Sequence, residues 1–204
     1  MIRAAERLGV EHVVKLSALG ASSRSKAGLG REHWDAEQAL IESSLDWTIL
    51  RPHSFMQNWL DDLADEVRAE GAIHSPVGEG RVPFIDARDI AAVAARVLLD
   101  PEAHAGRKYT LTGGEAVGYE RVAAAISRAI RKPIEYRPIS MEEARARMEA
   151  RGLAPSLIDG LLALAAYQRA GGPTERISDD VERVLGRAPR TVEEFAEDYV
   201  EAFR

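Results

Sequence analysis

Cysteine is absent from the 204-residue chain. Disulfides, thiolate nucleophiles and cysteine-based metal sites are therefore excluded, and the fold needs no oxidising compartment. The histidines have no partners at metal-ligand spacing, so we expect no metal site. Long apolar runs are missing too: no stretch approaches the roughly 20 apolar residues that cross a bilayer, and the first residues lack the apolar core of a signal peptide. We therefore expect a cytoplasmic protein with no membrane segment.

Positive charge is in the minority. The chain has 27 basic and 33 acidic residues, which gives a net charge of -6. Such a balance repels phosphate backbones and anionic lipid head groups, so nucleic acid is not expected as a direct ligand. The apolar content of 46% is enough to fill the core of one large domain, or of a compact domain with a small appendage.

Strand-like and helix-like patterns alternate over residues 1–139. A helix that feeds a strand through a glycine turn opens the chain, and a second helix and strand follow. Apolar spacing and breaker residues predict helices at 1–8, 31–43, 54–70, 87–99 and 119–131. They predict strands at 12–18, which we expect to be buried, and at 46–51, 108–112 and 134–139, with a Gly-Glu-Gly turn at 78–80 between two further extended segments. Successive strand–helix steps favour a parallel sheet with crossover helices.

The pattern becomes helical from residue 140 onward. Ser140 with Glu143, and Thr191 with Glu194, have the spacing of capping boxes. The expected helices are 141–151, 155–170, 178–186 and 191–203. We therefore predict an α/β domain over residues 1–139, followed by a small helical cap over residues 140–204.

Two loops follow the first two predicted strands. They are residues 17–20 and residues 51–55, and in a parallel sheet both lie at the carboxyl ends of strands, where ligands bind. Gly, Ser and Pro after a strand often do no more than turn the chain. Because two such loops share one edge of the sheet, we expect a ligand site there.

An ordered set of short strings resembles the NmrA-like branch of the atypical short-chain dehydrogenases/reductases. The strings are HWDAEQAL at 33–40, LDWTILRP at 45–52, FIDARDIA at 84–91, YTLTG at 109–113, ISDDV at 177–181 and GRAPRT at 186–191, with Phe195. They cover essentially the whole chain in the right order. The resemblance implies a protein that binds NADP or NAD, with NADPH favoured, on a Rossmann-like doubly wound parallel sheet.

The resemblance also implies a first βαβ unit with a glycine-rich turn, on which the pyrophosphate rests at a helix N-terminus. No such fingerprint occurs in these 204 residues. We therefore expect the chain to be the C-terminal part of a doubly wound sheet, as a fragment, a gene product with a misplaced start or a natural truncation, and to bind the dinucleotide poorly by itself. The exposed edge of such a sheet invites association, and a homodimer would cover it.

Typical short-chain dehydrogenases use a catalytic pair, a Tyr and a Lys four residues later, and by resemblance the matching positions here are His33 and Glu37. A carboxylate cannot lower the pKa of a proton donor as the lysine does. His33 is our candidate proton donor because an imidazole titrates near about pH 6.5. The alternative is a helix histidine that pairs with Glu37.

The resemblance assigns further residues to the site. Ser17, Ala18 and Leu19 would pass beside the ribose and nicotinamide. Pro52, His53, Ser54 and Phe55 would cover the nicotinamide end. Phe55 and Met56 would line a substrate slot and Asn58 would hydrogen-bond there, although core packing and solvent exposure are open alternatives for these three.

Two functions remain open at this point. The first is an NAD(P)-dependent oxidoreductase that transfers a hydride to a small molecule, in the manner of an NADPH:quinone reductase, because quinone reduction needs a positioned nicotinamide and an apolar slot more than it needs the lost pair. The second is a non-catalytic protein that senses NAD(P) and acts through protein partners, as the resemblance also allows.

Overall fold

The computed structural model describes residues 1–25 and 28–204, which divide into two compact units. The first unit contains residues 1–53, 87–112 and 178–189. The second unit contains residues 54–86, 113–177 and 190–204. The predicted division into an α/β domain over residues 1–139 and a helical cap over residues 140–204 stays a prediction.

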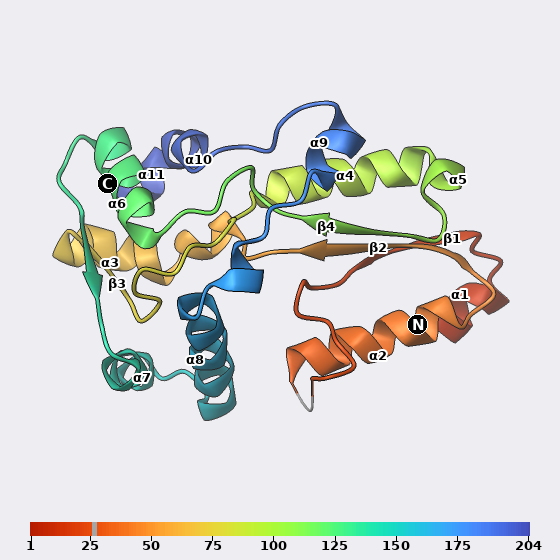
Figure 1. Cartoon of the computed structure of the whole chain (residues 1–204), viewed down its shortest axis with the longest axis horizontal. Helices are drawn as coiled ribbons and strands as arrows, with labels where there is room; N and C mark the ends of the chain where they lie inside the picture. Colours follow the sequence, from red (N-terminus) through yellow and green to blue (C-terminus); the bar gives the residue numbers. More distant parts are fainter. Residues whose placement is uncertain (26–27) are drawn as a thin grey trace. The chain divides into compact units, whose positions relative to one another are not determined.

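The first unit is a parallel sheet with helices on both faces. Its elements are α1 (Ile2–Arg7), β1 (His12–Leu16), α2 (Leu29–Ile41), β2 (Asp46–Pro52), α4 (Ala87–Leu99), α5 (Pro101–His104), β4 (Arg107–Leu111) and α9 (Asp180–Leu185). The strand order is β1-β2-β4, and both pairings are parallel. Figure 1 shows α4 on one side of this sheet and α2 on the other. The predicted α/β class with a doubly wound parallel sheet is confirmed.

Burial follows the position of each strand in this sheet. The central strand β2 has Thr48 and Ile49 fully buried and Leu50 1% exposed, as expected for a strand covered on both faces. In contrast, β1 has one strand neighbour among the described residues, and its Leu16 is 50% exposed. The expectation of a buried first strand was therefore wrong, because β1 lies at an edge of the sheet.

The second unit combines a two-stranded parallel sheet with helices. Its elements are the 3₁₀ helix η1 (Met56–Trp59), α3 (Asp62–Glu70), β3 (Ala72–Ser75), α6 (Tyr119–Ile130), β5 (Glu135–Pro138), α7 (Met141–Ala150), α8 (Pro155–Arg169), the 3₁₀ helix η2 (Gly172–Glu175), α10 (Val192–Asp198) and α11 (Val200–Phe203). Its core gathers around Trp59, whose ring meets those of Phe84 and Phe195 edge to face, with ring centroids 4.8 Å and 5.4 Å apart. Such aromatic pairs add to the burial of their area.

The helix predicted over residues 54–70 was wrong in its first part. Phe55 is extended and forms a parallel bridge with Ile85. The Met56 amide donates to the Ile85 carbonyl at 2.9 Å, and the Ile85 amide donates to the Ser54 carbonyl at 3.0 Å. These long-range bonds hold residues 54 and 55 in strand geometry, so a 3₁₀ turn follows and α3 begins only at Asp62.

The extended segments on either side of Gly78–Gly80 have different partners. β3 pairs in parallel with β5, and Val82 forms an antiparallel bridge with Val117. The segments before and after the turn therefore pair with other parts of the chain and do not form a hairpin with each other.

Of the two predicted capping boxes, the one at Thr191 is complete and the one at Ser140 has only its hydroxyl half. The Thr191 hydroxyl accepts from the Glu194 amide at 3.1 Å. The Thr191 amide in turn donates to the Glu194 carboxylate, which completes the capping box. The Ser140 hydroxyl accepts from the Glu143 amide at 3.0 Å. The helix predicted at 191–203 is interrupted at Tyr199, between α10 and α11. Among the described helices, none combines the length and apolarity that crossing a membrane requires.

Candidate functional site

The two predicted loops meet at the carboxyl edge of the sheet in the first unit. The Leu19 amide donates to the Pro52 carbonyl at 3.1 Å, so the chain after β1 runs beside the end of β2. Ser17 and His53 are buried, 4% and 8% exposed, and Ala18 is half-buried. The five residues of this unit that are predicted to lie beside the ribose and nicotinamide therefore form one short rim. Their role in cofactor binding stays a prediction.

A buried carboxylate lies behind this rim. Glu37 of α2 is fully buried and accepts from the Ser17 hydroxyl at 2.5 Å and from Arg51 Nε at 2.9 Å. Arg51 Nη2 lies 2.5 Å from the second oxygen of Glu37. Burial raises the pKa of Glu37, but the hydrogen bonds from Arg51 and Ser17 lower it by more, so the net pKa falls below the ordinary value. Glu37 is thus an ionised anchor that fixes the Ser17 hydroxyl and the end of β2.

Lys108 of β4 adds a second cation to this cluster. Its ammonium lies 3.7 Å from the Glu37 carboxylate. It also lies near two tryptophan rings, 5.9 Å from the centroid of Trp34 and 6.0 Å from that of Trp47. An ammonium near such ring faces is attracted by their negative charge distribution. Sequence reasoning missed this arrangement, because its members come from three separate segments.

His33 lies one helical turn before Glu37 but has a different partner. Its Nδ1 is 3.3 Å from the Lys15 ammonium of β1, and the ring is half-buried. Burial lowers the pKa of His33 and the charge of Lys15 lowers it further, against smaller opposing effects of Glu37 and Glu32. The ring is therefore mostly neutral at pH 7 and accepts from Lys15. The alternative of a His33–Glu37 pair is not what the structure shows, and the proton-donor role stays a prediction.

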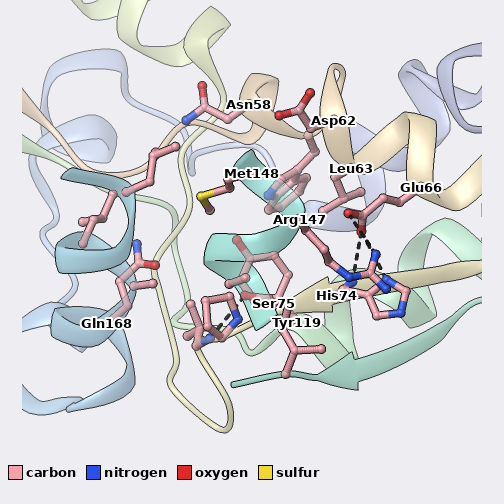
Figure 2. Close-up of a pocket in the computed structure, with 18 of the residues that line it drawn as sticks. Asn58, Asp62, Leu63, Glu66, His74, Ser75, Tyr119, Arg147, Met148 and Gln168 are labelled. Atoms are coloured by element: carbon pink, nitrogen blue, oxygen red, sulfur yellow. Dashed lines mark hydrogen bonds and ion pairs between the residues drawn. The ribbon is translucent and has the colours of Figure 1, made fainter. Parts of the chain in front are cut away.

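The second unit contains a cavity of about 250 Å³. Ser54, Phe55 and Asn58, all predicted for the site, line it. Met56 does not: it is 1% exposed and packs into the core of this unit, which was the open alternative for that residue. Residues from α3, α6, α7 and α8 complete the walls, as Figure 2 shows.

One part of the cavity wall is aromatic. Trp59, Phe84 and Tyr119 line it, and the rings of Phe84 and Tyr119 meet edge to face at 5.6 Å. Burial raises the pKa of Tyr119 to about 12. Its hydroxyl is therefore uncharged at any working pH and is able to donate or accept a hydrogen bond.

Helix α8 forms another wall. Gln168 is 5% exposed, and its Nε2 donates to the Ser54 hydroxyl at 2.9 Å. Leu161 and Leu164 line the cavity on the preceding turns of the same helix. Sequence reasoning missed Gln168, although a single glutamine directly after the largely apolar stretch 157–167 was a usable signal.

A charged cluster occupies the wall between α3 and α7. His74 Nδ1 lies 3.4 Å from Glu66, and Arg147 Nη1 lies 3.8 Å from Glu66 and 3.4 Å from Glu70. Figure 2 shows Glu66, His74 and Arg147 converging beside the cavity. Arg147 pairs with both carboxylates, so away from this cluster the cavity offers a ligand mainly apolar surface with a few hydrogen-bonding groups.

Within residues 1–25 and 28–204, no group of three or more His, Asp or Glu side chains has the geometry to hold a metal ion.

Comparison with known proteins identifies the chain's relatives. The model of the NmrA-like family matches residues 1–196. An NAD(P)H azoreductase of Xenophilus azovorans is 39% identical over 206 aligned residues, which cover 100% of this chain and 70% of the relative. The oxidoreductase YesF of Bacillus subtilis is 37% identical, over 96% of this chain and 66% of the relative. The chain thus spans about two thirds of the length of these relatives.

Solved structures show the same fold. The NADPH-dependent quinone oxidoreductase of Escherichia coli, complexed with NADPH, superposes with a TM-score of 0.84 and 27% identity over 97% of this chain and 68% of that one. The negative transcriptional regulator NmrA, in complex with NADP, superposes with a TM-score of 0.70 at 17% identity over 98% and 68%, a likeness of fold alone. The family match confirms the predicted resemblance, and two relatives that are 39% and 37% identical are named as an NAD(P)H azoreductase and an oxidoreductase.

Proposed function

The chain belongs to the NmrA-like family, and from that premise we propose that it forms the acceptor-binding part of an oxidoreductase that uses NAD(P)H to reduce a small, flat, uncharged molecule. A quinone is the favoured acceptor and an azo compound the next. The observation that carries the proposal is the cavity of the second unit, lined by Ser54, Phe55 and Asn58, with an aromatic wall and carboxylates that are ion-paired to Arg147. Such a cavity favours a planar apolar acceptor with a few hydrogen-bonding atoms.

The cofactor in this proposal is a nicotinamide dinucleotide, which supplies the hydride when bound. NADPH is favoured because the E. coli quinone oxidoreductase, 27% identical, is complexed with NADPH. Ser17, Ala18, Leu19, Pro52 and His53 would hold the nicotinamide and ribose. This set contains no lysine or arginine, so it suits the nicotinamide and ribose rather than the pyrophosphate.

The proposed reaction balances as NADPH plus a quinone plus one proton giving NADP and the hydroquinone. The hydride comes from NADPH, and the single proton comes from solvent or from His33, the proposed donor. The buried Glu37 fixes the Ser17 hydroxyl at the cofactor rim, so its contribution is positional.

A turnover assay with the purified full-length product of the gene tests this proposal. NADPH and menadione are mixed with it, and the absorbance of NADPH is followed, with an azo dye and a ketone as comparison acceptors. We expect consumption of NADPH with menadione, and less with the ketone, because the Tyr and Lys pair that reduces carbonyls is replaced by His33 and Glu37. Tight NADPH binding with no turnover of any acceptor would contradict the enzyme and favour the sensing alternative, which has less support among the relatives.

A homodimer remains part of the proposal. The outer edge of β1 has no strand beside it among the described residues, and Leu16 on that strand is 50% exposed. Unpaired edges of this kind favour association. Sedimentation of the purified protein at several concentrations decides between monomer and dimer.

A further inference from the structure

An apolar stripe runs along one face of α8. Leu157, Leu161 and Leu164 are three or four residues apart, so they lie on the same side of the helix as Gln168. The three leucines are 52%, 37% and 45% exposed, whereas Gln168 is 5% exposed. The stripe therefore leads from a buried polar end to an exposed apolar end.

The stripe is continuous with the cavity. Leu161, Leu164 and Gln168 line the cavity, while Leu157 lies beyond its lining residues, one turn further toward the start of α8. At the inner end, Gln168 is hydrogen-bonded to Ser54, and Asn58 is also a lining residue. From Gln168 to Leu157 the helix rises about 16 Å. A ligand with its polar part at the inner end would thus have an apolar path toward solvent.

The surroundings of the stripe are apolar as well. Met148 and Leu153 line the same cavity from α7 and the loop after it, and Figure 2 shows Met148 between the Gln168 wall and the α3 wall. The acidic residue of α8, Asp159, pairs with Arg145 of α7 rather than joining the cavity. Exposed leucines in a row of this length are an unfavourable surface unless something covers them.

We propose that the acceptor carries an aliphatic tail. Its polar ring lies near Ser54, Asn58 and Gln168, and its tail lies on Leu164, Leu161 and Leu157. This substrate class, a ring with a long alkyl or isoprenoid substituent, rests on the proposed function and narrows it. Continuity with the cavity is what assigns the stripe to the ligand rather than to a second copy of the chain.

The physical consequence is a dependence of affinity on tail length. Each methylene group that leaves water for an apolar surface favours binding, and a stripe that covers one side of the tail gives roughly a twofold gain per methylene. The gain should continue until the tail passes Leu157 and then stop.

The experiment compares a series of 2-alkyl-1,4-benzoquinones, from methyl to decyl, in NADPH turnover. In parallel, equilibrium dialysis measures the binding of the corresponding alkyl hydroquinones to the protein under anaerobic conditions. The variants are Leu161→Ser, inside the cavity, and Leu157→Ser, outside it. Leu98→Ser on α4 is the matched control, because Leu98 is 59% exposed and lies in the first unit. Circular dichroism checks that each variant is folded.

We expect KM and Kd to fall as the tail grows, and this trend to flatten in both α8 variants but not in Leu98→Ser. The methyl acceptor should behave alike in wild type and Leu98→Ser. KM and Kd values that do not change with tail length would contradict the tail site. So would a trend with tail length that is the same in both α8 variants as in the wild type. Neither result would contradict the proposed reduction. If dialysis shows binding that strengthens with tail length but no acceptor is turned over, the tail site is supported and the proposed function is contradicted. Self-association that Leu157→Ser abolishes, without tail dependence, would assign the stripe to a second copy.

Discussion

The Glu37 carboxylate and the Arg51 guanidinium form a two-pronged ion pair, with Nε–Oε1 at 2.9 Å and Nη2–Oε2 at 2.5 Å. The pair joins α2 to the carboxyl end of β2, and Glu37 also accepts from the Ser17 hydroxyl at the end of β1. One buried carboxylate therefore ties together the two strand ends at which we propose that the nicotinamide binds. Two-pronged pairs of this kind are among the strongest polar contacts in proteins.

Replacing Glu37 should be costly for the fold. In Glu37→Gln, Arg51 keeps a neutral partner in a largely buried place, and we expect a loss of about 3 kcal/mol in the free energy of unfolding. Urea denaturation measures it. The control is Asp35→Asn on the same helix, because Asp35 pairs with Arg31 at the surface and such pairs contribute less than about 1 kcal/mol. Equal losses in the two variants would contradict the anchoring role.

The same carboxylate makes stability depend on pH. The pKa of Glu37 is lower in the folded protein than the ordinary value of 4.5. Its contribution is therefore fully present above that value and is lost as the pH falls through the folded-state pKa. We expect the urea midpoint to decrease as the pH is lowered below about 4.5, and to decrease less steeply in Glu37→Gln. Parallel curves for the two proteins would show that other carboxylates carry the effect.

A second test concerns a close backbone approach in the second unit. A Cβ atom on Gly113 would lie 2.2 Å from the carbonyl oxygen of Phe84, whose ring lines the cavity. Gly113→Ala should therefore force the backbone apart and cost about 1–3 kcal/mol. Gly160→Ala is the control, because nothing lies within 4 Å of its added Cβ on α8, and alanine there should stabilise by about 0.5–1 kcal/mol. Thermal unfolding compares the two, and a harmless Gly113→Ala would remove the steric argument.

Local pattern predicted most of the fold because the determining signals lie within single elements. The face of α6 that carries Val122, Ile126 and Ile130 is the buried one, and the Thr191–Glu194 box caps α10. The predictions that were wrong concern residues whose structure is set by contacts far away in the sequence. Phe55 is extended because it pairs with Ile85, and β1 is half-exposed because of its place at the sheet edge, and neither fact is encoded in the residues concerned.

The site was predictable to the same extent. Ser54, Phe55 and Asn58 were found because a family string ends beside them. Gln168 was missed because its partner, Ser54, is 114 positions away in the sequence. Arg51 was also missed as the partner of Glu37. The resemblance indicated only that Glu37 stands where typical short-chain dehydrogenases have a lysine.

The proposed proton donor has a pH signature. The pKa of His33 is lowered by burial and by Lys15, so the protonated ring that donates becomes populated only below about pH 6.5. If it is the donor, turnover should rise as the pH falls toward that range, and His33→Ala should remove this rise and lower turnover by roughly 10²-fold. Steady-state rates across pH measure both effects. Near wild-type turnover with an unchanged profile would leave His33 as a helix residue that contacts Lys15.

The central claim is that a hydride passes from the nicotinamide to an acceptor bound by this protein. Single-turnover oxidation of NADPH by menadione, with deuterium at one or the other face of nicotinamide C4, tests it most directly. We predict slower oxidation when one face is deuterated and an unchanged rate when the other is, because a held cofactor presents one face to the acceptor. Equal rates with both labels, or no oxidation at saturating acceptor, would contradict the account.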